Sequence, residues 1–302
     1  MKKIFNSISS ILVLAALFLA ACSSATESSD SGLKVLTSTT FLADITRNIA
    51  GDRAQVESLL PAGTDPHSYQ PVPADAARIN ESKLLIVNGL EYEHFLESLL
   101  ENAGGERVVI TASDGLEPRP MEEHGQEAGD PHMWLDPNHV IPYVENIREG
   151  LSHFDPDGAA VYQANADAYV KQLKDLDAWI VDEVAQIPPE KRLLVTNHEA
   201  LGYFSDRYGF TIIGAIVPSV STDASTSAGQ LAELIDLINS SGTSAIFLDE
   251  VENPVLAQQI AEETGVKVVE DLHLESLTDG APAGTYVDMM KHNVSKIVEA
   301  LK

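Results

Sequence analysis

Short runs of apolar residues alternate with helix-like patterns along most of the chain. The apolar runs have the length of buried strands and occupy residues 34–37, 56–60, 84–87, 108–110, 193–196, 211–217, 245–248 and 266–269. Helix-like patterns lie between or after them, at residues 92–102, 201–208, 228–239, 254–263 and 286–301. Because strands alternate with helices, the pattern predicts an α/β fold in which helices flank mainly parallel sheets.

One longer helix is predicted in the middle of the chain. Asp155-Pro156-Asp157-Gly158 is typical of a helix start, and Ile187-Pro188-Pro189 is typical of a stop. Between them, apolar side chains recur at spacings of 7, 4, 3, 4 and 4, which places them on one helix face: Tyr162, Tyr169, Leu173, Leu176, Ile180 and Val184. About thirty residues at 1.5 Å each give a rod of roughly 45 Å. We therefore predict two α/β lobes joined by one long rigid helix, rather than by a hinge of crossing strands.

The first residues indicate export. Lys2 and Lys3 precede eleven uncharged, apolar residues at 11–21, a stretch too short for the ~20 residues of a spanning helix but typical of a signal peptide. The stretch ends in Leu19-Ala20-Ala21-Cys22, which resembles a bacterial lipobox, so we expect cleavage before Cys22 and lipid on its new N-terminus. An ordinary signal peptide with an incidental cysteine is the alternative. The polar run 23–32 is predicted to be a flexible tether. These features predict a protein on the extracytoplasmic face of the cell membrane.

The predicted organisation follows from these signals. It comprises a signal peptide and lipobox at 1–22, the tether at 23–32, an N-terminal lobe at 33–154, the linking helix at 155–188 and a C-terminal lobe at 189–302. Cys22 is the only cysteine, which rules out an internal disulfide framework. We expect a monomer.

The net charge of the chain excludes few classes of ligand. The formal net charge is −27, from 46 acidic and 19 basic residues. A nucleic-acid ligand needs clustered lysine and arginine, so this balance argues against one. The charge is compatible with attracting cations, although most surface carboxylates simply keep a protein solvated.

Three of the nine histidines stand in loop-like contexts between the predicted elements. His67 and His198 follow predicted strands, and His132 lies in Asp130-Pro131-His132-Met133-Trp134. In parallel α/β sheets, residues at the carboxyl ends of strands face the ligand crevice. The spacings of 65 and 66 residues exclude a local chelate but permit a site closed by folding, with His67 and His132 from one lobe and His198 from the other. Imidazole suits zinc, manganese, iron, copper or nickel far better than calcium or magnesium.

Five sequence blocks, in order, carry a resemblance to a known family. They are Gly63-Thr64-Asp65-Pro66-His67, Pro131-His132-Met133-Trp134-Leu135-Asp136-Pro137, Asn197-His198-Glu199-Ala200 with Gly202-Tyr203-Phe204 after it, Ser221-Thr222-Asp223-Ala224-Ser225-Thr226-Ser227 and Gly284-Thr285-Tyr286-Val287-Asp288-Met289-Met290-Lys291-His292-Asn293. They resemble the zinc- and manganese-binding solute-binding proteins of ABC importers. The resemblance implies two α/β lobes bridged by a rigid helix, metal ligation by His67, His132 and His198, and delivery of the metal to a membrane permease.

The resemblance also implies a carboxylate as the fourth ligand, and its position is less direct. The family's carboxylate, usually an aspartate, falls about ten residues before Gly284-Thr285-Tyr286, where Glu275 fits with a one-residue gap. Asp271 and Asp279 fit only with larger shifts, His273 would make an all-nitrogen site, and water could complete the site instead. We predict Glu275 as the ligand, and we interpret Glu250 as a group behind the ligands or on the cleft wall.

The metal and the class of protein follow from this ligand set. Three imidazoles and one carboxylate match the four-coordinate preference of Zn²⁺, so zinc is the first choice and Mn²⁺ the second. A short stretch with one histidine stands where zinc-specific members carry a long histidine-rich loop, which weakens the case for zinc. We expect a binding protein and no enzyme. The alternatives are a secreted zinc metallohydrolase, with Glu199 as its general base, and a surface adhesin. Neighbours on an extended segment point to opposite sides, so Glu199 is expected to face away from His198.

Overall fold

The structure, a computed structural model, describes residues 33–123 and 126–302. Leu33–Lys302 form one compact unit, which contains both sheets. The predicted signal peptide, tether and lipid site at Cys22 lie outside the described residues. Across 33–123 and 126–302, no helix combines the length and the apolar character that crossing a bilayer requires.

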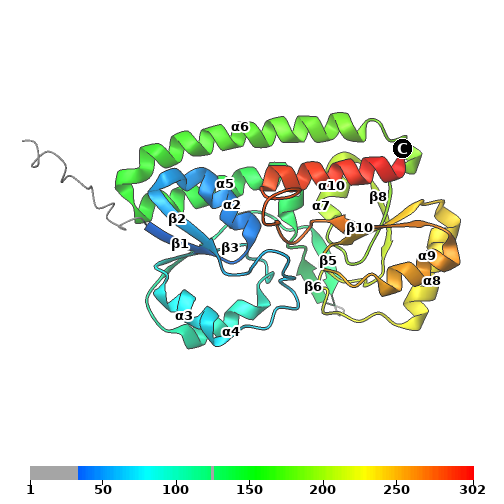
Figure 1. Ribbon diagram of the computed structural model, residues 1–302, viewed down its shortest axis with the longest axis horizontal. Coiled ribbons are helices and arrows are strands. Elements are labelled where there is room, and N and C mark those ends of the chain that lie inside the picture. Colours follow the sequence, from blue (N-terminus) through cyan, green and yellow to red (C-terminus); the bar gives the residue numbers. More distant parts are fainter. Residues whose placement is uncertain (1–32, 124–125) are drawn as a thin grey trace, which may run out of the picture. The chain divides into compact units, whose positions relative to one another are not determined.

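Two four-stranded parallel sheets organise the chain (Figure 1). The first has the order β2-β1-β3-β4, and its strands are β1 (Leu33–Thr37), β2 (Ala54–Ser58), β3 (Leu84–Val87) and β4 (Val108–Thr111). The second has the order β10-β9-β7-β8, and its strands are β7 (Leu193–Thr196), β8 (Thr211–Ala215), β9 (Ala245–Asp249) and β10 (Lys267–Leu272). All residues of β3 and β9 are buried, as expected for strands covered by helices on both faces.

Helices cover both sheets. Those near the first sheet are α2 (Thr40–Ala50), α3 (Pro73–Glu81), α4 (His94–Ala103) and α5 (Pro137–Phe154). Those of the second half are α7 (Gly202–Tyr208), α8 (Ala228–Ser241), α9 (Val255–Thr264) and α10 (Tyr286–Leu301). The predicted α/β class, with two sheet-based halves, is therefore confirmed.

The predicted long helix is also confirmed as an element, α6 (Ala159–Val184). Its 26 residues correspond to a length of roughly 39 Å. The apolar stripe predicted from the sequence is buried, with Ala166 filling its seven-residue gap. Figure 1 shows α6 passing α2 and α5 of the first half and α10 of the second, and it contacts all three. Where the lobes begin and end, at 154 and 189, stays a prediction.

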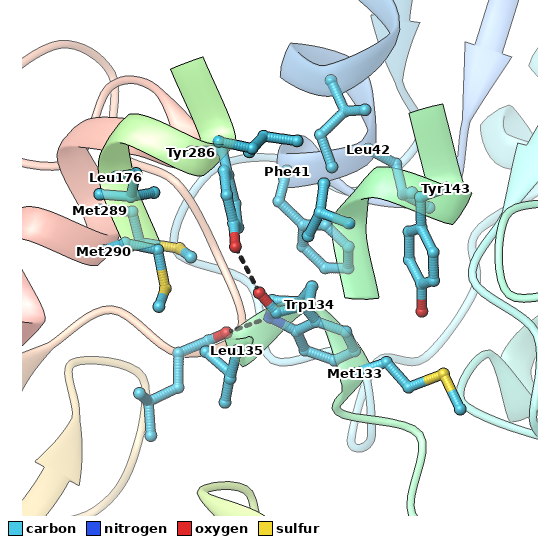
Figure 2. Close-up of a cluster of buried hydrophobic side chains, with 14 of the residues drawn as sticks. Phe41, Leu42, Met133, Trp134, Leu135, Tyr143, Leu176, Tyr286, Met289 and Met290 are labelled. Atoms are coloured by element: carbon cyan, nitrogen blue, oxygen red, sulfur yellow. Dashed lines mark hydrogen bonds between the residues drawn. The ribbon is translucent and has the colours of Figure 1, made fainter. Parts of the chain in front are cut away.

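A continuous core links the two halves beside α6 (Figure 2). Trp134 is fully buried and stacks on Phe41 at a centroid distance of 4.4 Å. Its indole Nε1 donates to the carbonyl oxygen of Leu274 at 2.8 Å, and the Tyr286 hydroxyl donates to the Trp134 carbonyl oxygen at 2.6 Å. Since these bonds are buried, they hold the segment before α10 firmly against the first half.

Several segments differ from the sequence-based expectation. The helices α2, α3 and α5 lie where none was named from the sequence. β5 (Pro120–Glu123) and β6 (Gln126–Gly129) form an antiparallel hairpin where a loop was expected, because these strands are short and lack apolar alternation. β10 continues to Leu272 through a bulge, although Glu270 and Asp271 were placed in the following loop. The polar character of these two residues reflects an exposed edge strand and not a strand end.

Candidate metal centre

Four side chains predicted from the sequence converge on one point. His67, His132, His198 and Glu275 each offer a ligand atom, and these atoms lie within 4.8 Å of one another. Their exposed fractions are 7%, 0%, 1% and 1%. Among residues 33–123 and 126–302, this is the one group of three or more histidine, cysteine or acidic side chains that could hold a metal ion. Neither Asp271, which pairs with Lys296, nor the exposed Asp279 takes part.

The geometry suits a single ion. The three imidazole centroids are 5.3–5.6 Å apart, close to an equilateral triangle. Glu275 Oε1 lies 3.1 Å from His198 Nε2 and 3.3 Å from His132 Nε2, and its Oε2 lies 3.9 Å from His67 Nε2. The three Nε2 atoms therefore surround the carboxylate at a spacing that one metal ion could bridge.

The two sheets position these side chains at the ends of their strands. His67 lies in the loop after β2, and His198 directly follows β7. Glu275 lies three residues beyond β10, and His132 comes between β6 and a short 3₁₀ turn, Met133–Leu135. In parallel sheets the carboxyl ends of the strands form the ligand crevice, so the site has the expected location.

An aspartate two residues earlier orients each of the first two histidines. Asp65 Oδ1 accepts the backbone N–H of His67 at 2.9 Å. Asp130 Oδ1 accepts the backbone N–H of His132 at 3.0 Å and lies 2.9 Å from its Nδ1. Both pairs are written Asp-Pro-His, and aspartate is a residue that bonds the backbone two positions on. This repeated motif was the sequence signal that could have identified both aspartates.

The other two side chains are oriented through tertiary contacts. Glu252 Oε1 lies 2.6 Å from His198 Nδ1, which leaves Nε2 facing the centre. The hydroxyl of the buried Tyr92 donates to Glu275 Oε2 at 2.6 Å. Asp249 Oδ2 accepts the backbone N–H groups of Leu274 and Glu275. No local sequence pattern indicates these partners, which come from segments far apart in the chain.

Glu250 is not the group behind a ligand histidine, which was one of its two interpretations. Its carboxylate lies 3.0 Å from His273 Nδ1, and the carboxylate behind His198 belongs to Glu252, two residues further along the turn after β9. A place for Glu250 on the cleft wall stays a prediction. Glu199, the candidate base of a hydrolase, is not among the converging residues either, and its backbone N–H donates to the Ser219 carbonyl oxygen.

Burial and charge together set the protonation of the four groups. Burial alone would raise the pKa of Glu275, but the surrounding histidines hold it well below its usual value. Burial is the main cause that lowers the pKa of His67, to about 3. Burial opposes protonation of His132 and His198 too, yet Glu275 with Asp130 or Glu252 raises both pKa values, that of His198 strongly. Protons on His132 and His198 therefore compete with a metal ion that enters the site.

Comparisons with known proteins agree with this fold and this arrangement. Residues 35–300 match the family described as zinc-uptake complex component A, periplasmic (ZnuA). The chain is 36% identical to the manganese-binding lipoprotein MntA of Halalkalibacterium halodurans, over 100% of this chain and 99% of that protein. It is 33% identical to the iron-binding protein YfeA of Yersinia pestis, over 88% of this chain and 85% of that protein.

Solved structures of metal-binding proteins have a similar fold. A structure of TroA, from a study of its metal-binding specificity, superimposes with a TM-score of 0.83 at 32% identity and covers 90% of this chain and 100% of that one. The Mn-bound S38A variant of a periplasmic metal-binding protein from Candidatus Liberibacter asiaticus gives a TM-score of 0.80 at 31% identity, over 89% of this chain and 99% of that one.

Proposed function

The chain belongs to the ZnuA family of zinc-uptake components, and we propose that it captures one divalent transition-metal ion and delivers it to the permease of an ABC importer. The proposed ligands are Nε2 of His67, His132 and His198 and the carboxylate of Glu275. The observation that carries the proposal is the convergence of these four buried groups, each with its own orienting partner. Three imidazoles and one carboxylate form a ligand set that favours transition metals over calcium and magnesium.

Burial of the site favours a carrier over the metallohydrolase alternative. A catalytic zinc keeps an open coordination position for water and substrate and needs a nearby general base. Here the most exposed of the four groups, His67, has an exposed fraction of only 7%. A completely enclosed ion suits capture and transfer, because it reaches no substrate while the protein stays closed.

We propose zinc as the ion that binds most tightly and manganese as the second. The affinity of a given nitrogen and oxygen site rises from manganese to zinc, so thermodynamics alone favours zinc. The relatives above are named for manganese and for iron, which supports manganese as a cargo when zinc is scarce. Selectivity in a cell then depends on which metal is available as much as on affinity.

We also propose that lipid on Cys22 holds the protein at the extracytoplasmic face of the membrane, where a monomer meets its permease. The lipobox-like Leu19-Ala20-Ala21-Cys22 supports this attachment, and MntA is named a lipoprotein. A polar tether at 23–32 would give the binding unit freedom to reach the permease.

Metal analysis and competition test the proposed function. Protein purified without added metal is analysed for bound metals, stripped, and titrated with zinc and manganese separately and at equal concentrations. We expect one ion per chain, and zinc in preference to manganese. A chain that binds neither ion would refute the function, and uptake of manganese in preference to equimolar zinc would refute the order of the metals. Turnover of ester or peptide substrates by the zinc-loaded protein would instead support the hydrolase.

A further inference from the structure

The four converging groups are enclosed, so an ion can reach them only if some contact between the two halves opens. Of the four, His67 is the most exposed, at 7% against 0–1% for the others. The surface nearest to the site therefore lies at the His67 loop. On the side of α10, by contrast, buried bonds from Trp134 to Leu274 and from Tyr286 to Trp134 and Asp44 hold the halves together.

Two hydrogen bonds join the His67 loop to the second half of the chain. The backbone N–H of Gly63 donates to Ser276 Oγ at 2.9 Å, next to Glu275, and the other bond connects two side chains. The Thr222 hydroxyl donates to Asp65 Oδ2 at 2.6 Å, across 157 residues of sequence. Both side chains are partly exposed. The same carboxylate accepts the backbone N–H of His67 through Oδ1, so Thr222 acts on His67 through Asp65.

The segment that carries Thr222 is in turn fixed to the neighbours of His198. The backbone N–H of Val217 donates to the Asn197 carbonyl oxygen at 2.6 Å, and that of Glu199 donates to the Ser219 carbonyl oxygen at 2.8 Å. Thr222 thus links the supports of two of the proposed ligands that come from different sheets. A break at Thr222 separates the His67 loop from the His198 loop and leaves the other contacts of each intact.

We propose that Thr222 and Asp65 form a latch over the entrance of the metal site and that this latch sets the rates of metal capture and release. Both are positioning residues, because neither offers an atom to the four converging groups. A partly exposed hydrogen bond, in competition with water, opens more readily than the buried bonds near α10. The His67 edge is therefore the first to separate. The latch rests on the proposed function, since it governs access to the same site.

Substitutions at Thr222 test the latch in the full-length chain. Thr222→Val keeps the shape of the side chain and removes the donor, whereas Thr222→Ser keeps the donor and serves as the rescue. Thr226→Val is the matched control, because the Thr226 hydroxyl lies in the same loop and has no hydrogen-bond partner. Thr222→Ala is a second test of the missing donor, should the valine pack badly.

The measurements are the rate of zinc transfer to an excess of a coloured chelator and the absorption spectrum of bound Co²⁺, which reports the ligand geometry. We expect Thr222→Val and Thr222→Ala to release zinc about tenfold faster than the parent, with an unchanged Co²⁺ spectrum, while Thr222→Ser and Thr226→Val resemble the parent. Release within twofold of the parent in both variants overturns the latch, and so does a changed Co²⁺ spectrum, which would place Thr222 in the site itself. A parent chain that holds no metal refutes the proposed function instead.

Discussion

Replacement of Glu275 by glutamine removes the negative charge of the side chain and keeps its size and shape. Glutamine fills the same space and still offers an oxygen to the Tyr92 hydroxyl, which lies 2.6 Å from Glu275 Oε2. The charge next to His132 and His198, at 3.3 and 3.1 Å, is lost. A divalent ion bound there would have only neutral ligands around it in a buried position.

The size of the effect follows from the burial of the carboxylate. Removal of one partner from a buried ion pair costs about 3–5 kcal/mol, which corresponds to roughly a 100- to 4,000-fold increase in the Kd for the metal. Metal binding stabilises the folded protein by mass action, so the gain in Tm on addition of metal should shrink as well. At about 2–4 °C per kcal/mol, that gain should fall by roughly 6–20 °C.

Competition titration against a chelator of known affinity and thermal unfolding with and without zinc measure both quantities. The matched control is Asp279→Asn, the same chemical change at an exposed position in the following loop, which should leave the Kd and the Tm gain unchanged. If Glu275→Gln binds zinc within threefold of the parent, Glu275 is not a ligand and water completes the site.

The remaining predictions concern protons, the support of His198, motion and the anchor. Because a histidine must lose its proton to bind metal and the pKa values of His132 and His198 are raised, affinity should already fall as the pH drops toward ~6.5 from above, with proton release visible by calorimetry in two buffers of different ionisation enthalpy. Without metal, the lowered pKa of Glu275 stabilises the fold above about 4.5 and this contribution is lost as the pH falls below that value, so the difference in Tm between the parent and Glu275→Gln should shrink below about pH 4.5. Glu252→Gln should weaken zinc binding about 10- to 100-fold in the same titration, and an unchanged Kd would contradict its role. Scattering profiles with and without metal should nearly superimpose, because the core around Trp134 joins both halves, and a change of several ångström in radius of gyration would refute this. Mass spectrometry should find lipid on the mature N-terminus of the parent and none after Cys22→Ala.

The sequence predicted the elements well where apolar residues dominate them. β3 and β7 have the predicted bounds, and α10 begins and ends at the predicted residues. Buried strands appear in the sequence as apolar runs, and amphipathic helices appear as apolar residues at helical spacing. The prediction failed for the β5–β6 hairpin and for the end of β10, where exposure removes the apolar signal. The helices α2 and α5 were not named from the sequence either, although both bury apolar side chains.

In the candidate site, the converging side chains were predictable from the sequence and most of their orienting partners were not. The side chains that converge could be named from the sequence, because loop histidines after strands and family blocks both point to them. Their orienting partners could not, except for Asp65 and Asp130, which precede their histidines by two residues. Glu252 lies 54 residues from His198, and Tyr92 lies 183 residues from Glu275, so only the folded chain brings them together. The confusion of Glu250 with Glu252 has the same origin, since the direction of a side chain after β9 depends on the turn.

The paired protonation of the site explains how so much charge can be buried without a metal. Glu275 is completely enclosed, and an enclosed carboxylate with no compensating charge would be strongly destabilising. The raised pKa values of His132 and His198 supply up to two positive charges at hydrogen-bond distance from it. When both histidines are protonated, a divalent ion that displaces the two protons brings the same charge, so the net charge around Glu275 is the same before and after binding. In that state, the charge of the ion gives the fold no reason to rearrange, and the proposed opening of the His67 edge suffices to exchange protons for metal.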